Sequence, residues 1–221
     1  MRNSSKALLY GLLLKVSGFL KISFLIGSQM IWFSASNSII PLAGAFGGIM
    51  GAALLFLVRQ VIHLFFFKTI SLSFLAFCIP GFCASLYWAT NHLLIRVGIP
   101  VACMILFVLH PIAGNVWFYS LYWLIPILIH YNSRKSLFLH ALASTFIAHA
   151  VGSVIWCYTM PMTETMWLAL LPIVIVERIL FALGMVIAHY MLTFIFEKID
   201  YASATTISRT HYSSLGSSYG K

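Results

Sequence analysis

The chain has 221 residues, of which 62% are hydrophobic, 15% aromatic and 8% charged. A soluble domain carries about 25% charged residues, so this composition excludes an ordinary globular enzyme and a disordered chain. The formal net charge of +9 comes from 13 Lys and Arg against 4 Asp and Glu. Most of the basic residues lie between apolar runs, as the positive-inside rule predicts for cytoplasmic loops, so the charge reports membrane topology and not a nucleic-acid partner.

Apolar runs long enough to cross a bilayer recur along the chain, since a membrane-spanning helix needs about 20 apolar residues. They predict an all-α polytopic membrane protein, a six-helix transmembrane bundle with both termini cytoplasmic. In that orientation Lys68, Arg134 and Lys135 lie in cytoplasmic loops, and Arg96 lies outside. The six runs cover residues 8–33, 42–67, 72–90, 98–131, 137–158 and 166–196.

Two segments need a separate interpretation. The run at 98–131 is too long for one straight helix and contains Pro111 and Gly114. These residues permit either a kinked or re-entrant segment or a tight turn between two short spans, so seven spans remain an alternative. Residues 1–196 are expected to form a single transmembrane helical domain. Residues 197–221 shift to Ser, Thr, Tyr and Gly, which predicts a flexible polar cytoplasmic tail.

Small residues at a spacing of four occur in the first two predicted spans. Such residues form a stripe on one face of a helix, where the backbone of a neighbouring helix can approach closely. The second span opens on PLAGAFGGIMGA, and no Lys-Ser/Thr pair follows it, which argues against a glycine-rich phosphate loop. The predicted helix-packing residues are Ser23, Gly27, Gly44, Gly47, Gly48 and Gly51.

Glu177 and Arg178 are the only adjacent opposite charges inside an apolar run. Neighbouring side chains on a helix point about 100° apart, so each of the two needs partners on other helices. Because the other acids lie at the ends of spans, Arg178 must find backbone carbonyls, Glu177, or an acidic group that is not part of this chain. A structural ion pair and a substrate contact therefore both remain open.

Aromatic and polar residues gather at the span ends assigned to the outer face. An aromatic belt at the membrane interface gives the same enrichment, but amides and hydroxyls within spans are not needed by a belt. Stacking surfaces with a few polar groups are typical of a small-molecule pocket. The histidines and cysteines lack metal-ligand spacing, and no catalytic residue, metal or cofactor is predicted. The candidate substrate-binding residues are Trp88, Asn91, His92, Asn115, His149, Trp156, Glu177 and Arg178.

The stretch PLAGAFGGIMGA, and later LHALASTFIAHAVGSVIW followed by LLPIVIVERILFALG, carry a likeness to a known family. In outline, residues 8–196 resemble the substrate-binding S component of an energy-coupling factor (ECF) type vitamin transporter. The resemblance implies uptake of a micronutrient across the bacterial cytoplasmic (inner) membrane, with the ligand captured by loops at 34–40, 90–97 and 159–165. It also implies that a transmembrane coupling subunit docks at Ser23 and Gly27 and that separate ATPases supply the energy.

Two other classes of function remain open. An intramembrane enzyme would use His149 with Glu177 as base and acid on a lipid-like substrate, and a scaffold or assembly subunit would bind no ligand of its own. For the binding protein we expect an anionic group of the ligand near Arg178, because a buried guanidinium suits carboxylate or phosphate. Asn115, His149 and Trp156 would complete the wall of that site.

Overall fold

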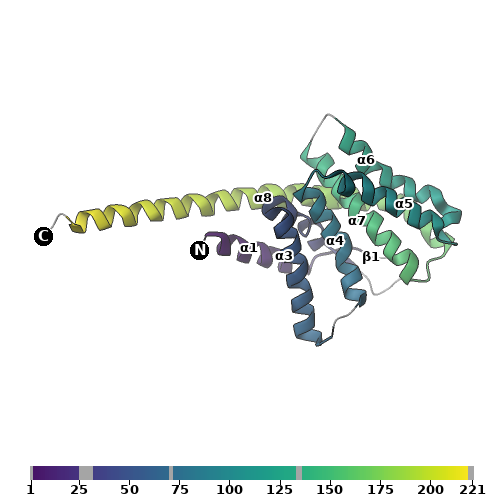
Figure 1. Ribbon diagram of the computed structural model, residues 1–221, viewed down its shortest axis with the longest axis horizontal. Helices are drawn as coiled ribbons and strands as arrows, with labels where there is room; N and C mark the ends of the chain where they lie inside the picture. Colours follow the sequence, from purple (N-terminus) through teal and green to yellow (C-terminus); the bar gives the residue numbers. More distant parts are fainter. Residues whose placement is uncertain (1, 25–31, 70–71, 133–135, 219–221) are drawn as a thin grey trace.

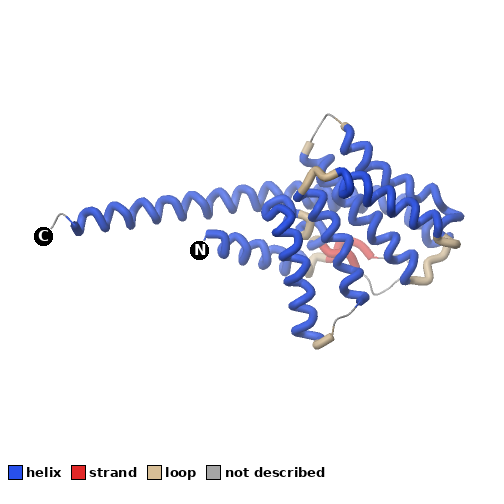
Figure 2. Tube along the Cα trace, viewed as in Figure 1, coloured by secondary structure: helices blue, strands red, loops and turns tan. Residues whose placement is uncertain are grey.

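The computed structural model describes residues 2–24, 32–69, 72–132 and 136–218, and nearly all of this chain is helical (Figures 1 and 2). Within the described residues, three helices are long and apolar enough to cross a membrane, and two shorter apolar helices cover Ser73–Ala89 and Leu94–Leu109. These helices fit an all-α membrane protein, while the number of six spans stays a prediction. In chain order the elements are α1 (Arg2–Ser17), β1 (Lys21–Phe24), β2 (Trp32–Ser34), α2 (Ser36–Ile39), α3 (Leu42–Phe67), α4 (Leu72–Ala89), the π-helical turn η1 (Leu94–Gly98), α5 (Ile99–Leu109), the 3-10 helix η2 (Ala113–Trp123), α6 (Leu124–Tyr131), α7 (Leu137–Thr159) and α8 (Glu164–Ser218).

The predicted first span over residues 8–33 is not a single helix. α1 ends at Ser17, and after Gly18 the chain forms an antiparallel pair in which Lys21 of β1 lies opposite Ser34 of β2. Gly18 disfavours continuation of the helix, and Lys21 would be costly inside hydrocarbon. Ser23 therefore lies in a strand instead of on a packing stripe, and Gly27 lies outside the described residues.

The long run at 98–131 is divided into two helical segments that fold back on each other. α5 ends before His110, which has extended backbone (φ −75°, ψ 133°), and Pro111 cannot continue a helix. A tight turn follows, in which Gly114 N donates to His110 O at 2.8 Å, and η2 then packs against α5. Of the two sequence-based alternatives, the turn between two short segments is the one formed.

The helical segments from α3 to α8 alternate in direction when η1 is counted together with α5, and η2 together with α6. The ends of α3 and α4 are paired by Gly44 with Ser85 and by His63 with Phe74. We call the end that holds Leu42, Ala89, Leu94, Tyr131 and Leu137 the proximal end. The end that holds Phe67, Leu72, Leu109, Thr159 and Glu164 is the distal end. Figure 1 shows that the α3–α4 hairpin diverges from α5–α8 toward the distal end.

The same alternation is visible across the middle of the molecule. Ser144 Oγ of α7 donates to Ala84 O of α4 at 3.1 Å, and Pro80 lies 3.7 Å from the position of a Cβ on Gly152. α4 and α7 are thus antiparallel neighbours. Their close contact depends on small side chains at both surfaces.

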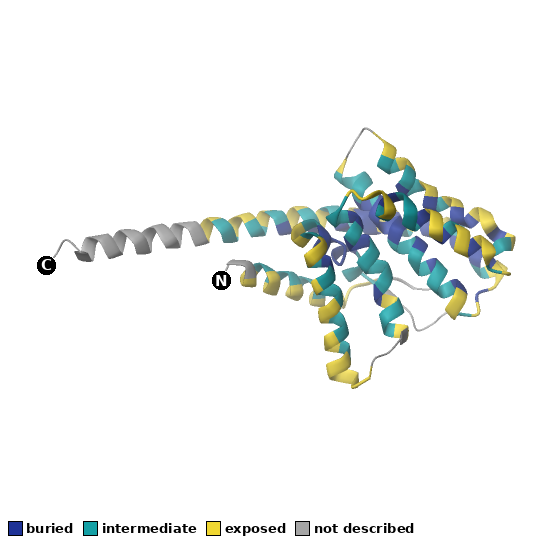
Figure 3. Cartoon of the chain, viewed as in Figure 1, coloured by how far each residue is buried: buried dark blue, intermediate teal, exposed yellow. Residues whose placement is uncertain are grey.

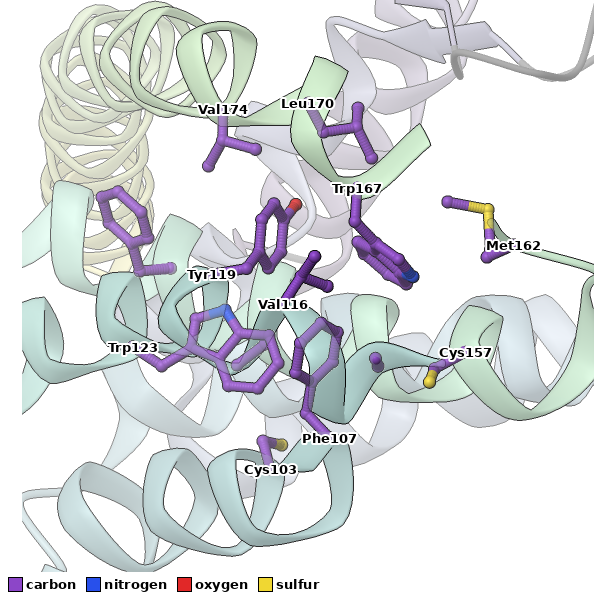
Figure 4. Close-up of a cluster of buried hydrophobic side chains, with 13 residues drawn as sticks. Cys103, Phe107, Val116, Tyr119, Trp123, Cys157, Met162, Trp167, Leu170 and Val174 are labelled. Atoms are coloured by element: carbon purple, nitrogen blue, oxygen red, sulfur yellow. The ribbon is translucent and has the colours of Figure 1, made fainter. Parts of the chain in front are cut away.

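Aromatic side chains form the densest part of the core, between α5, η2, α7 and the start of α8 (Figure 4). Phe107 is fully buried and meets Trp123 and Trp167 edge-on, with ring centroids 5.2 and 4.9 Å apart. Tyr119 meets Trp167 at 5.0 Å. Buried positions concentrate in this region, whereas the outer face of α3 is largely exposed (Figure 3), as expected for a helix that faces lipid.

The glycines of α3 do not form one packing stripe. Gly44 faces α4 at close range, whereas a Cβ on Gly47 or Gly48 would meet no heavy atom within 4 Å. Gly48 has φ +60° and ψ −156°, a conformation that only glycine adopts easily, and it interrupts α3 with a kink. A Cβ added to Gly51 would lie 2.6 Å from the carbonyl oxygen of Ala43 of the same helix, so Gly51 faces the kink instead of a neighbouring helix.

The polar segment after Glu197 has helical backbone as far as Ser218, as the continuation of α8. Near its start it is held by α1, where Lys6 Nζ lies 2.7 Å from a carboxylate oxygen of Asp200. The flexibility predicted for residues 197–221 stays a prediction.

Candidate functional site

A cavity lies between the α3–α4 hairpin on one side and α7 and α8 on the other. Its volume is about 110 Å³, smaller than the roughly 300–1,000 Å³ of most small-molecule pockets. Its wall includes residues on both sides of the level where Pro80 faces Gly152, with Ile40 and Met185 toward the proximal end and Arg59 and Trp156 toward the distal end. Its polar and aromatic wall consists of Asn37, Arg59, Phe77, Tyr119, Thr145, His149, Ser153, Trp156, Trp167, Glu177, Arg178 and Phe181.

The helical repeat explains why α7 supplies so much of this wall. Thr145, His149, Ser153 and Trp156 follow one another at intervals of three or four and therefore share one face of the helix. Trp167, Leu170, Val174, Glu177, Phe181 and Met185 repeat at the same intervals on α8.

Four of the eight predicted binding residues meet in this cavity: His149, Trp156, Glu177 and Arg178. The side chains of Asn91 and His92 are exposed in the loop between α4 and η1 at the proximal end. Sequence reasoning placed this loop beside Trp156 because it counted residues 8–33 as a span.

Trp88 and Asn115 also lie outside the cavity. Trp88 Nε1 donates to the sulfur of Met185 at 3.1 Å, within the core between α4 and α8. Asn115 is exposed at the distal end, where its amide donates to a carboxylate oxygen of Glu164. Because a turn, and not a continuous span, occupies residues 110–112, Asn115 stands at the end of the molecule.

Arg178 is the most deeply buried charge of the wall, with 8% of its surface exposed. Its Nη2 lies 3.3 Å from Glu177 Oε2, longer than the roughly 2.7–2.9 Å of a well-aligned charged pair. Nη1 donates to Thr145 O at 3.5 Å, and the guanidinium lies over the ring of Phe181, 4.9 Å from its centroid. The buried Nε has no hydrogen-bond partner among the described residues, so the hydrogen-bonding capacity of this guanidinium is only partly used.

His149 and Tyr119 form a second polar pair in the wall. The ring nitrogen Nε2 of His149 lies 3.1 Å from the hydroxyl of Tyr119. Tyr119 is 1% exposed and is held by the aromatic core, so this pair is fixed in position beside the cavity.

Arg59 of α3 is a wall residue that the sequence analysis did not select. The signal was present, because Arg59 is a charge inside an apolar run, as Arg178 is. Arg59 has no acidic neighbour in the sequence, whereas Arg178 was selected because Glu177 lies next to it.

Metal binding finds no support in the described residues, where no three His, Cys, Asp or Glu side chains are grouped closely enough to hold an ion. Comparison with protein-family models, curated proteins and solved structures gives no match to this chain. The resemblance to S components therefore rests on the sequence patterns alone.

Proposed function

We propose that this chain is the membrane-embedded binding subunit of an uptake system for a small anionic micronutrient. The observation that carries the proposal is the buried, incompletely paired guanidinium of Arg178 in the wall of a cavity that also contains Trp156 and Trp167. A planar cation beside aromatic faces suits a flat ligand with a carboxylate or phosphate group. The coupling subunit, the ATPases and the bacterial inner membrane enter the proposal through the resemblance.

The distribution of charge supports capture from outside. Among the described residues, the segments at the proximal end carry Lys6, Arg96 and Lys198, and the segment after α3 at the distal end carries Lys68. The positive-inside rule therefore assigns the proximal end to the cytoplasm. Trp156 lies near the distal end of α7, so the aromatic half of the cavity faces the outer side.

Native mass spectrometry of the protein purified gently in detergent tests the proposal. The wild type should retain a small molecule, and Arg178→Lys should retain it at least tenfold less, about 1.4 kcal/mol in binding free energy, while its unfolding midpoint stays near that of the wild type. Lysine keeps the charge but loses the planar fork.

Arg96→Lys is the matched control. Arg96 is also buried, but it donates to Thr90 O and Tyr87 O at 3.2 and 3.0 Å and lies outside the cavity, so retention should not change. An empty wild-type protein, or equal retention by Arg178→Lys, overturns the proposal. Turnover of a lipid-like substrate by the isolated chain would instead favour the intramembrane enzyme.

A further inference from the structure

The charges of the cavity wall are unbalanced. Its charged residues are Arg59, Glu177 and Arg178, two cations and one carboxylate. Glu177 lies against Arg178. The carboxylate is thus engaged by the guanidinium next to it, and Arg59 of α3 adds a second positive charge to the wall.

Arg59 differs from the two other arginines of the apolar helices in how its charge is accommodated. Arg96 donates to two backbone carbonyls and lies 4.1 Å from the centroid of the Tyr87 ring. Arg178 has Glu177 and Thr145 O. The guanidinium of Arg59, in contrast, is in no ion pair among the described residues, and it lies over the ring of Phe74, 6.0 Å from the centroid. That distance is at the outer limit of a cation–π interaction.

Arg59 is also placed well inside its helix. It lies eight residues before Phe67, the last residue of α3, which corresponds to about 12 Å along the helix axis. A charge at such a depth is costly in a membrane and marks a polar pathway or a ligand site. Since Arg59 lines the cavity, an anion in the cavity is the partner that the geometry offers.

The guanidinium groups of Arg59 and Arg178 lie at different depths. Arg178 contacts Thr145, whereas Arg59 contacts Phe74 of α4, on the distal side of the contact between Pro80 and Gly152. Between these levels the wall holds Phe77, Ile155 and Trp156, together with the polar side chains of His149 and Ser153. To contact both guanidinium groups, a ligand needs an acidic group at each end and a flat middle that fits beside Phe77 and Trp156.

We propose that Arg59 is a second anion-binding residue of this cavity and that its ligand is an elongated, flat dianion, held at one end by Arg178 and at the other by Arg59. This inference rests on the proposed binding function and narrows its ligand class. Such a ligand contacts α3 through Arg59 and α8 through Arg178, on opposite sides of the cavity.

Three probes of one shape test the inference: naphthalene-2,6-dicarboxylate, 2-naphthoate and the neutral 2-naphthalenemethanol. Binding to the full chain in detergent is followed by quenching of tryptophan emission, because Trp156 and Trp167 line the cavity, and by the shift of the unfolding midpoint. The wild type should bind the dicarboxylate at least tenfold more tightly than the monocarboxylate, and the alcohol least. Arg59→Gln should weaken the dicarboxylate alone, so that the two acids bind equally.

Lys68→Gln, just beyond the end of α3 and outside the cavity, is the control and should keep the preference for the dicarboxylate. If Arg59→Gln does not fold, Arg59→Lys decides, since it keeps the charge but loses the fork and should weaken only the dicarboxylate. Equal affinities of the two acids for the wild type, an undiminished preference in the Arg59 variants, or no binding of any probe overturns the inference. The proposed function stands or falls separately, on whether the wild type retains a molecule in native mass spectrometry.

Discussion

The contact between α3 and α4 at Gly44 gives the sharpest prediction about stability. A Cβ added to Gly44 would lie 1.8 Å from Ser85 O and 2.7 Å from its carbonyl carbon, whereas real Cβ atoms keep at least 3.0 Å. Both neighbours are main-chain atoms of α4, so no side chain can rotate away. Gly44→Ala therefore forces the two helices apart by at least 1.2 Å, the difference between 3.0 and 1.8 Å.

The cost has two parts and one offset. Overpacking costs about 1–3 kcal/mol, and the separation disturbs the hydrogen bond from Ser85 Oγ to Ile40 O, 2.9 Å long, which contributes about 1 kcal/mol. Alanine restores up to about 1 kcal/mol through its better helix propensity. The net loss is about 1–3 kcal/mol. In a chain of this length that lowers the unfolding midpoint by about 2–4 °C for each kcal/mol.

Gly47→Ala is the matched control, because it lies one turn away on the same helix and its Cβ would meet no atom within 4 Å. It should leave the midpoint unchanged or raise it slightly. Thermal unfolding in detergent can be followed with a thiol-reactive dye, since Cys78, Cys103 and Cys157 are buried in the folded protein. Equal midpoints for the two alanine variants would show that α3 and α4 do not approach each other at Gly44.

Three further predictions test other parts of the structure. Phe107→Ala removes a fully buried ring from the aromatic core and should cost about 3–5 kcal/mol in the same unfolding assay, whereas Leu109→Ala, 70% exposed, should stay within about 0.5 kcal/mol of the wild type. Arg96→Gln removes the donors that bind the last carbonyls of α4 and should lower the free energy of unfolding by about 1.5–3 kcal/mol without changing ligand retention; an unchanged midpoint would refute that role. Single cysteines in place of Asn91 and Lys68 should react with a membrane-impermeant reagent from the cytoplasmic and the outer side, respectively, and the reverse pattern would restore the topology expected from the apolar runs.

The helices that could be predicted from sequence are those whose apolar runs are bounded on both sides by polar residues, glycine or proline. The run at 42–67 coincides with α3, and that at 137–158 differs from α7 by one residue. The prediction of one helix over 8–33 was wrong because it relied on the length of the apolar run. Gly18 and Lys21 interrupt that run, and the helix ends at Ser17. Apolar length reports burial in hydrocarbon but not the continuity of a helix.

The cavity was predictable in part, for a related reason. Arg178 and Glu177 could be selected because an unusual charge in an apolar run signals function within a single element. Arg59 is brought to the same cavity only by the packing of α3 and α4 against α7 and α8, and no periodicity within one helix reports such a meeting. Some residues, such as Asn91, were assigned to the site because they were expected on the outer side of the membrane. That expectation depended on the number of spans counted before them.

The structure differs from the predicted spans at 8–33 and 98–131, yet most of the later segments keep their predicted side of the membrane. Removing the span at 8–33 reverses the side of the loops at 34–40, 68–71 and 90–97, and dividing the run at 98–131 reverses the order once more. The two changes cancel for every later segment, so the loop that contains Arg134 and Lys135, the loop at 159–165 and the chain after Lys198 keep the sides first predicted. Labelling at those three segments cannot separate the two topologies. Positions 68 and 91 can, because there the alternation of α3, α4 and α5 and the count of apolar runs predict opposite sides.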